Sequence, residues 1–218
     1  GAVPASDQVK PTFTAARTSS TTWTLTFSEN VDAAAANENS AWTISGGHVV
    51  TAVTDPANTN TLTITAAAST GTTGGQTITY VASAGTVVDS SANEVADGAT
   101  ANASDQVKPT FTAARTSSTN WVLTFSENVD AAAANENSAW TISGGHVVTA
   151  VTDPANTNTL TITAAASTGT TGGQTITYVA SAGTVVDSSA NEVADGATAN
   201  ASDQVKPTFT AARTALNT

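Results

Sequence analysis

A near-identical internal repeat constrains this chain more than any other feature. The heptapeptide ASDQVKP begins at Ala5, Ala103 and Ala201, and residues 5–102 match residues 103–200 at all but two positions. Thr22 and Thr24 of the first copy are replaced by Asn120 and Val122 in the second. A repeat of 98 residues is long enough to fold as a unit. The sequence therefore predicts two like domains, 5–102 and 103–200, and a segment at 201–218 that holds the linker and first strand of a third copy.

The chain is acidic but has few charged residues. Its 17 Asp and Glu against 6 Lys and Arg give a net charge of −11, and only 11% of residues are charged. Such a surface does not suit nucleic acid or anionic membranes, both of which require Lys and Arg. The chain has no cysteine, which excludes disulfides and thiolate chemistry. It also has no apolar run long enough for membrane insertion, and the first residues, GAVPAS, do not resemble a signal peptide.

Strict alternation of apolar and polar residues predicts β-strands. In 21–27 (TTWTLTF), Trp23, Leu25 and Phe27 alternate with threonines, which is the pattern of a half-buried strand. Further strands are expected at 12–17, 41–45, 48–53, 60–65, 76–81 and near Val87 and Val95. The expected core of each repeat is, in first-repeat numbering, Trp23, Leu25, Phe27, Trp42, Ile44, Leu62, Ile64, Ile78 and Tyr80. Short alternating strands with turn signals between them predict an all-β chain of tandem β-sandwich domains.

Two segments are expected to lie outside the strands. The alternation stops at Ser28, and Asp32 followed by four alanines predicts an N-cap with a short helical turn within 28–39. The Gly, Asp and Asn-rich segment at the end of each repeat is expected to form turns and the linker to the next copy.

The order of four motifs resembles a known family. These are LTFSENVD (25–32), WTI (42–44), QTITY (76–80) and VDSSANEV (88–95). Together they resemble the bacterial and archaeal Ig-like repeats of giant cell-surface proteins, which include SwmB-like, S-layer and adhesin repeats. The sequence departs from them at Ser91-Ala92-Asn93, where the family often has Ala-Gly-Asn. The resemblance implies two tandem Ig-like β-sandwich domains with a C-terminal extra strand, in an extracellular structural protein that often binds calcium.

Acidic residues near the end of each repeat predict a candidate calcium site. Calcium takes about six to eight oxygen ligands from carboxylates and carbonyls on flexible loops. The candidate ligands are Asp89, Asn93, Glu94, Asp97 and Asp105 in the first repeat, and Asp187, Asn191, Glu192, Asp195 and Asp203 in the second. Glu29 and Asp32 are near enough in the motif to join them. A cation there would stiffen the junction, whereas the alternative is a solvated acidic turn in which Asp89 and Asn93 cap backbone groups.

Other side chains suggest weaker possibilities. His48 and His146 have no partners at catalytic spacing and are expected to be strand or turn residues. The carboxylate pairs Asp89–Asp97 and Glu29–Asp32 are the only candidates for glycoside hydrolysis, and no insertion suggests a pocket, so we expect no enzyme. Lys10 could form an isopeptide crosslink with Asn93 or Asn102, although a solvated lysine is the simpler interpretation. Asn102 and Asn200 lie in N-x-S sequons and are candidate glycosylation sites.

The C-terminal segment repeats the first predicted strand, because residues 208–213 are identical to 12–17. It could run past a domain boundary, pack on the second domain, or complete the sheet of a neighbouring molecule by strand donation. The sequence thus predicts an extracellular structural module of a cell-surface filament, S-layer or adhesin stalk, whose partners are copies of the same repeat. The alternative is a glycan- or surface-binding adhesion module, which would require exposed aromatics such as Trp23 or Trp42.

Overall fold

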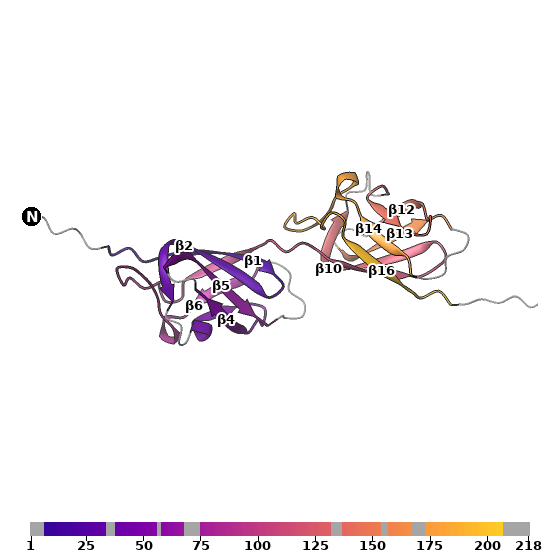
Figure 1. The fold of residues 1–218 in the computed structure, drawn as a ribbon. Coiled ribbons are helices and arrows are strands. Elements are labelled where there is room, and N and C mark those ends of the chain that lie inside the picture. Colours follow the sequence, from indigo (N-terminus) through magenta and orange to yellow (C-terminus); the bar gives the residue numbers. More distant parts are fainter. Residues whose placement is uncertain are drawn as a thin grey trace, which may run out of the picture. The chain divides into compact units, whose positions relative to one another are not determined.

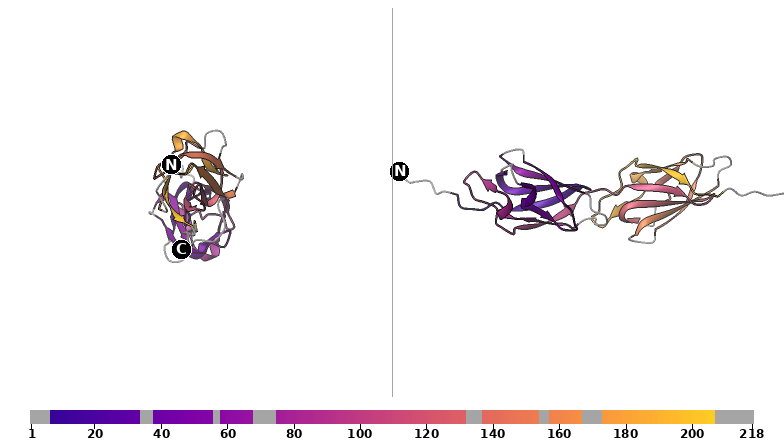
Figure 2. Two further views of the ribbon diagram at one scale, coloured as in Figure 1. Left: turned by 90° about the vertical axis from the view of Figure 1, so that its right-hand side faces the viewer. Right: turned by 90° about the horizontal axis from the view of Figure 1, so that it is seen from below.

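The computed structural model describes residues 7–33, 38–55, 58–67, 75–131, 137–153, 157–166 and 173–206. The chain divides into two compact units, unit 1 (Gly1–Val107) and unit 2 (Lys108–Thr218). Figures 1 and 2 show each unit as its own group of strands. The predicted all-β fold with two tandem sandwich-like domains is confirmed. The extra strand predicted at 208–213 lies outside the described residues.

Both units have the same strand order. Unit 1 contains β1 (Phe13–Ser19), β2 (Thr22–Ala33), β3 (Trp42–Ile44), β4 (Val50–Thr54), β5 (Thr59–Ala66), β6 (Thr77–Tyr80), β7 (Val87–Asp89) and β8 (Thr100–Asp105), with short 3-10 helices η1 (Glu38–Ala41) and η2 (Ala82–Ala84). Unit 2 contains β9 (Phe111–Arg115), β10 (Asn120–Ala131), β11 (Trp140–Ile142), β12 (Val148–Thr152), β13 (Thr157–Ala164), β14 (Thr175–Tyr178), β15 (Val185–Asp187) and β16 (Thr198–Asp203), with η3 (Ala180–Ala182). In unit 1 the strands are paired in the order β3-β6-β8-β1-β2-β5-β4, and β7 pairs with β2.

Strand β8 was expected to be a linker, yet it occupies the middle of this order. Its first half pairs antiparallel with β6, and its second half, Ala103 to Asp105, pairs parallel with β1. Ala103 is buried, and Ala99 and Ala101 pack against the same core. The residues ASD that begin the second sequence copy therefore complete unit 1. The folded units begin and end a few residues later than the sequence repeats.

Strand β2 is longer than the sequence indicated. It continues through Ala33 because its second half pairs with a further strand, β7. In this pairing, Val31 lies opposite Asp89 and Asp32 lies opposite Val88. The predicted break at Ser28 and the predicted N-cap at Asp32 are therefore wrong, since Asp32 lies in a ladder. The alanines at 34–36 lie outside the described residues.

The predicted core is confirmed in both units. Its nine members in unit 1 are all buried, and Val31, Val87 and Val95 join them. Val95 is buried in this core although it lies outside the strands. Its N–H donates a hydrogen bond to the Val87 carbonyl at 3.0 Å. The Trp42 ring meets Phe13 edge-on at 5.4 Å and Tyr80 at 5.1 Å between centroids. Offset and edge contacts of this kind add to the free energy gained by aromatic burial.

Candidate functional site

Three carboxylates come together at one end of unit 1. Asp7 precedes β1, Glu29 lies on β2 and Asp89 ends β7, and one carboxylate oxygen of each lies within 4.8 Å of the others. The pairing of Val31 with Asp89 places the β7 carboxylate beside the Glu29 segment. We call these three residues the acidic cluster.

The turn that follows β7 holds Asp89 in place. Its Oδ1 accepts hydrogen bonds from the backbone N–H groups of Ser91 and Asn93, both at 2.8 Å. The Asn93 amide donates to Asp89 Oδ2 at 2.7 Å and to the Asp7 carbonyl at 3.2 Å. Ala92 adopts φ 65°, in the left-handed region that favours glycine. The turn therefore places an alanine in a backbone conformation that usually takes glycine.

The cluster shifts two pKa values in opposite directions. Burial raises the pKa of Glu29, and the nearby charges of Asp89 and Asp7 raise it further. Burial also acts to raise the pKa of Asp89, but the hydrogen bonds from Asn93, Ser91 and Glu29 together hold that pKa below its ordinary value. Glu29 thus takes up a proton more readily than Asp89 does.

Two other predicted ligands of unit 1, Glu94 and Asp97, bond to groups outside the acidic cluster. Glu94 accepts a hydrogen bond from the Tyr80 hydroxyl at 2.9 Å, and Asp97 accepts one from the Ala82 N–H at 2.9 Å. Asp105 ends β8 and accepts the Val107 N–H at 3.0 Å. Asp32 is exposed on β2. The cluster therefore contains neither of the carboxylate pairs that were considered for hydrolysis.

Unit 2 repeats this arrangement. Asp187 accepts hydrogen bonds from the Asn191 N–H and amide, both at 2.8 Å, and lies within 4.8 Å of Glu127. Glu192 bonds to the Tyr178 hydroxyl at 2.7 Å and Asp195 to the Ala180 N–H at 3.0 Å. The role of Glu192 and Asp195 thus matches that of Glu94 and Asp97.

Sequence reasoning missed Asp7, although a signal for it was present. Asp7 is the repeat equivalent of Asp105 and Asp203, which were chosen. All three accept an N–H two residues further on: Asp7 from Val9 at 2.9 Å, Asp105 from Val107 at 3.0 Å and Asp203 from Val205 at 2.9 Å. Asp203 ends β16 as Asp105 ends β8.

The cluster has the chemistry of a cation site. Oxygens bound to one calcium ion at about 2.3–2.6 Å lie no more than about 5 Å apart, and the three carboxylates meet this limit. They would supply part of the coordination shell, and backbone carbonyls and water would supply the rest. The pKa of Glu29 is raised first by burial and then by repulsion from Asp89 and Asp7, and a cation would relieve that repulsion.

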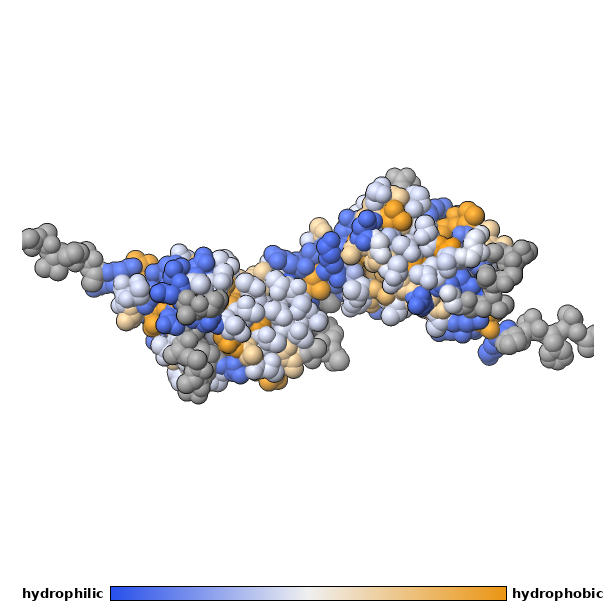
Figure 3. All heavy atoms as spheres, in the orientation of Figure 1, coloured by the Kyte–Doolittle hydropathy of each residue, from blue (hydrophilic) through white to orange (hydrophobic). Residues whose placement is uncertain are grey.

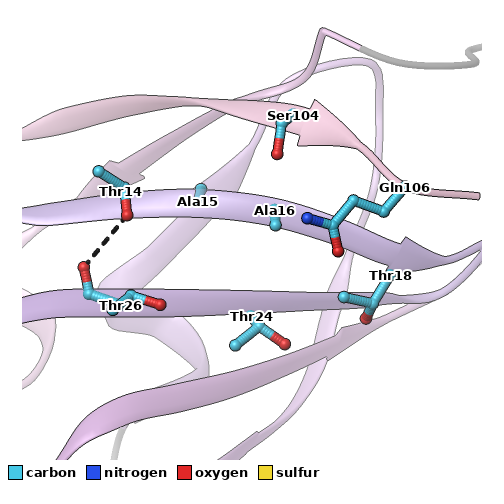
Figure 4. A pocket seen from close by; sticks show the side chains of 8 residues that line it. All are labelled: Thr14, Ala15, Ala16, Thr18, Thr24, Thr26, Ser104 and Gln106. Atoms are coloured by element: carbon cyan, nitrogen blue, oxygen red, sulfur yellow. Dashed lines mark hydrogen bonds between the residues drawn. The ribbon is translucent and has the colours of Figure 1, made fainter. Parts of the chain in front are cut away.

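A shallow hollow lies on the outer face of the sheet formed by β8, β1 and β2. Figure 4 shows its lining, which includes Thr14, Thr24, Thr26, Ser104 and Gln106. The lining has no ionisable side chain, so it offers no general acid or base. Thr24 is one of the two positions at which the sequence copies differ.

The described surface lacks an aromatic platform for sugars. Trp23 and Trp42 are 0% and 2% exposed, and the exposed large apolar residues among those described are Val9, Val49 and Val147. On the face shown in Figure 3, apolar colour forms small separate patches. His48 is also buried: its ring packs against Trp23 at 4.9 Å and its Nδ1 lies 3.3 Å from the Ala67 carbonyl. His48 thus lies beside a turn, as expected, and forms an isolated bridge with Ile44.

The remaining candidate residues are placed as follows. Lys10 is exposed before β1, and the Asn93 amide is held by Asp89. Asn102 is exposed on β8 and accepts a hydrogen bond from the Thr77 hydroxyl at 2.9 Å, and Asn200 accepts the same bond from Thr175 at 2.9 Å. Among the described residues, no helix is both long and apolar enough to cross a bilayer.

Comparison with known proteins finds no matching family model and no matching curated protein. Several solved structures show weak similarity, and three of them are described next. The N-terminal part of the bacterial S-layer protein SbsC is 12% identical over 90% of this chain and 45% of that one, with a TM-score of 0.35. The S-layer protein rSbsC(31-844) is 14% identical over 87% and 32%, with a TM-score of 0.36. The Bacteroides ovatus mixed-linkage glucan utilization locus protein SGBP-B, in complex with a mixed-linkage heptasaccharide, is 18% identical over 86% and 43%, with a TM-score of 0.24. The chain thus spans less than half the length of each.

Proposed function

We propose that this chain is a non-catalytic, structural tandem-repeat module of an extracellular cell-surface filament, S-layer or adhesin stalk. The observation that carries the proposal is strand β8. It begins in one sequence copy and ends in the next, and its second half pairs with β1. Each repeat therefore needs the first residues of its successor to complete its sheet, which is the behaviour expected of a continuous array.

Labelling of intact producing cells tests the location. An antibody raised against the folded chain is expected to bind intact cells, and external protease is expected to remove the signal. A signal that appears only after the cells are broken would refute a surface role. The same cells with a cytoplasmic marker protein provide the control for leakage.

We propose calcium as the ion for the acidic cluster, where it would stiffen the end of the unit. Calcium is expected to raise the melting temperature of the full chain relative to EDTA, because an ion bound only to the folded state stabilises it. Glu29→Gln should reduce this gain. Asp32→Asn removes the same charge from an exposed position of the same strand and should retain it. An equal calcium response in all three proteins would place the ion elsewhere.

Strand donation remains a second mode of assembly within this proposal. Residues 208–213 have the sequence of 12–17, so they match the first strand of any unit. In unit 1, β1 is already paired with both β2 and β8, so a donated copy must first displace it. Light scattering should then show a mass that grows with concentration for the full chain and not for a chain ending at Lys206. A mass of one chain for both would exclude donation.

The alternative of a glycan-binding module has less support from the described surface. All four tryptophans are buried, with exposures of 0% for Trp23 and Trp121 and 2% for Trp42 and Trp140. Hydroxyl groups of the threonine-lined hollow could bond to sugars, but no ring stacks beside them. Glycan-array binding that is lost on Thr24→Lys would favour this alternative.

A further inference from the structure

The first and last strands of each unit lie side by side and run in the same direction. In unit 1, β1 pairs parallel with β8, with Ala16 opposite Ser104 and Arg17 opposite Asp105. Figure 4 shows the strand of Ser104 beside the strand of Ala16. All other pairings of the described strands of unit 1 are antiparallel. We call β1–β8, and the equivalent β9–β16 of unit 2, the terminal pairs.

The direction of the two strands decides how a terminal pair responds to tension. The chain enters unit 1 at the start of β1 and leaves it at the end of β8, and in a parallel pair these two points lie at opposite ends. A pull on the chain from both sides would therefore slide the strands past each other, and every hydrogen bond between them would carry load at once. In an antiparallel pair, entry and exit would lie at the same end, and the bonds would break one after another.

Backbone hydrogen bonds join the two strands of the terminal pair. The Gln106 N–H donates to the Arg17 carbonyl at 3.0 Å, whereas the Ala103 N–H donates to the Gln76 carbonyl on the other side at 2.8 Å. Successive residues of a strand direct their backbone groups to opposite neighbours. Ser104, which follows Ala103, therefore directs its N–H and carbonyl toward β1. The bond of unit 2 that matches Gln106 to Arg17 is 2.9 Å long.

Side chains contribute little to the hold on β8. Its inward residues are Ala101 and Ala103, and the burial of so small a side chain stabilises much less than that of a leucine or phenylalanine. Strand β1 is fixed on its other side by a ladder with β2 that runs from Phe13 to Ser19. The resistance of β8 to a pull therefore depends mainly on its backbone bonds to β1 and β6. Ser104 and Gln106, which face β1, belong to the next sequence copy.

We propose that each unit is a force-bearing element and that its terminal pair resists tension along the chain. This inference rests on the proposed structural role, because a filament or stalk at a cell surface is pulled along its length. The motif that begins each copy would carry the load from that copy to the one before it. Forced unfolding is governed by the rate of unfolding rather than by the equilibrium free energy. The terminal pair should therefore control the unfolding force.

Single-molecule force spectroscopy with two attachment geometries tests the proposal. The chain has no cysteine, so one introduced cysteine defines a point of attachment. Pulling from tags at the two ends of the chain loads both terminal pairs in the sliding direction. Ser20→Cys lies in the exposed turn after β1, at the same end of the pair as Asp105. Pulling from this cysteine and the C-terminal tag would peel β8 from β1, while unit 2 is still loaded from end to end.

The two geometries should give different forces for unit 1. End-to-end pulling should give two unfolding events at similar force. From Ser20→Cys, one event should fall to about a half to a third of that force, because the load shared by three register pairs falls on one pair at a time. The other event, from unit 2, should be unchanged and is the internal standard. Two events of unchanged force would overturn the proposal. The result does not depend on where the protein is located, so labelling of cells tests the proposed function separately.

Matched proline variants test the backbone bonds. Gln106→Pro removes the N–H that donates to Arg17, and Val107→Pro removes an N–H that donates to the side chain of Asp105. In end-to-end pulling, Gln106→Pro should lower the unfolding force of unit 1 by roughly a third, because one bond of the ladder is lost. Val107→Pro should leave the force near that of the wild-type chain. Equal forces in the two variants would refute the role of the terminal pair. If Gln106→Pro prevents unit 1 from folding, the comparison of the two geometries decides the proposal.

Discussion

The hydroxyl group of Tyr80 allows a test of the structural role of Glu94 and the segment around it. Tyr80 is fully buried, and its hydroxyl donates to the Gly85 carbonyl at 3.1 Å or to Glu94 at 2.9 Å, while it accepts the Val87 N–H at 3.1 Å. This hydroxyl connects β6 to the start of β7 and to the turn after it. Tyr80→Phe removes all three contacts without a change of shape in the core.

The expected loss of unfolding free energy follows from the groups that lose a hydrogen-bond partner in Tyr80→Phe. The Val87 N–H is buried and would have no acceptor, which costs about 1–3 kcal/mol. Glu94 is only partly buried, so water can replace its lost donor at little further cost. We therefore expect unit 1 to lose about 1–3 kcal/mol of unfolding free energy, out of the roughly 5–15 kcal/mol typical of a domain.

Urea unfolding followed by tryptophan fluorescence measures this loss, with unit 2 as the internal standard. The two units differ at only two sequence positions, so their transitions should overlap in the wild-type chain. Tyr80→Phe should split them and lower one midpoint by about 1–2 M urea. Tyr178→Phe should give the same curve through unit 2, and the double variant should restore one transition at lower urea. An unsplit curve for Tyr80→Phe would refute the reasoning.

Three further predictions follow from the other parts of the fold. A chain ending at Asn200 should lose the cooperative unfolding of unit 2 in circular dichroism, because Ala201 to Asp203 pair with β9, whereas a chain ending at Lys206 should keep it. Ala92→Gly should stabilise unit 1 by about 0.5–1 kcal/mol, because glycine accepts the left-handed backbone that alanine resists; a lower urea midpoint would contradict this. In EDTA, the raised pKa of Glu29 means that folding favours its protonated form, so the melting temperature should fall as pH rises from the ordinary glutamate pKa through the raised one. Glu29→Gln should flatten that fall, while the loss of stability on acidification below the ordinary aspartate pKa, through the lowered pKa of Asp89, should remain.

The core strands could be predicted because large apolar residues mark their inward side. Trp23, Leu25 and Phe27 alternate with threonine, and every one of them is buried. In strand β8 apolar and polar residues also alternate, but the apolar residues are smaller. Its inward residues are Ala101 and Ala103, and small side chains contribute little to a hydrophobic pattern. The second half of β2 was missed for another reason: Glu29 and Asp32 are polar and signal a turn, whereas their pairing with β7 depends on residues far along the chain.

The candidate site was only partly predictable from the sequence. Acid composition identified Asp89 and Asn93, which the structure joins through the Asn93 amide. Composition could not distinguish Glu94 from them, because its role depends on Tyr80, which lies on another strand. Arg17 gave no signal at all, since an arginine at the end of a predicted strand is usually solvated. Only the structure reveals its burial against Trp23.

The offset between repeat and fold gives one short motif two structural roles. Within unit 1, the aspartate of ASDQVKP is seen in two roles: Asp7 belongs to the acidic cluster at the beginning of the unit, and Asp105 ends the strand that completes it. A substitution that favours one role of the motif must also be compatible with the other role. The strand end requires small alternating residues, and the cluster requires a carboxylate. We therefore expect substitutions in this motif to be less tolerated than those on the outer face, where the copies differ at Thr22 and Thr24.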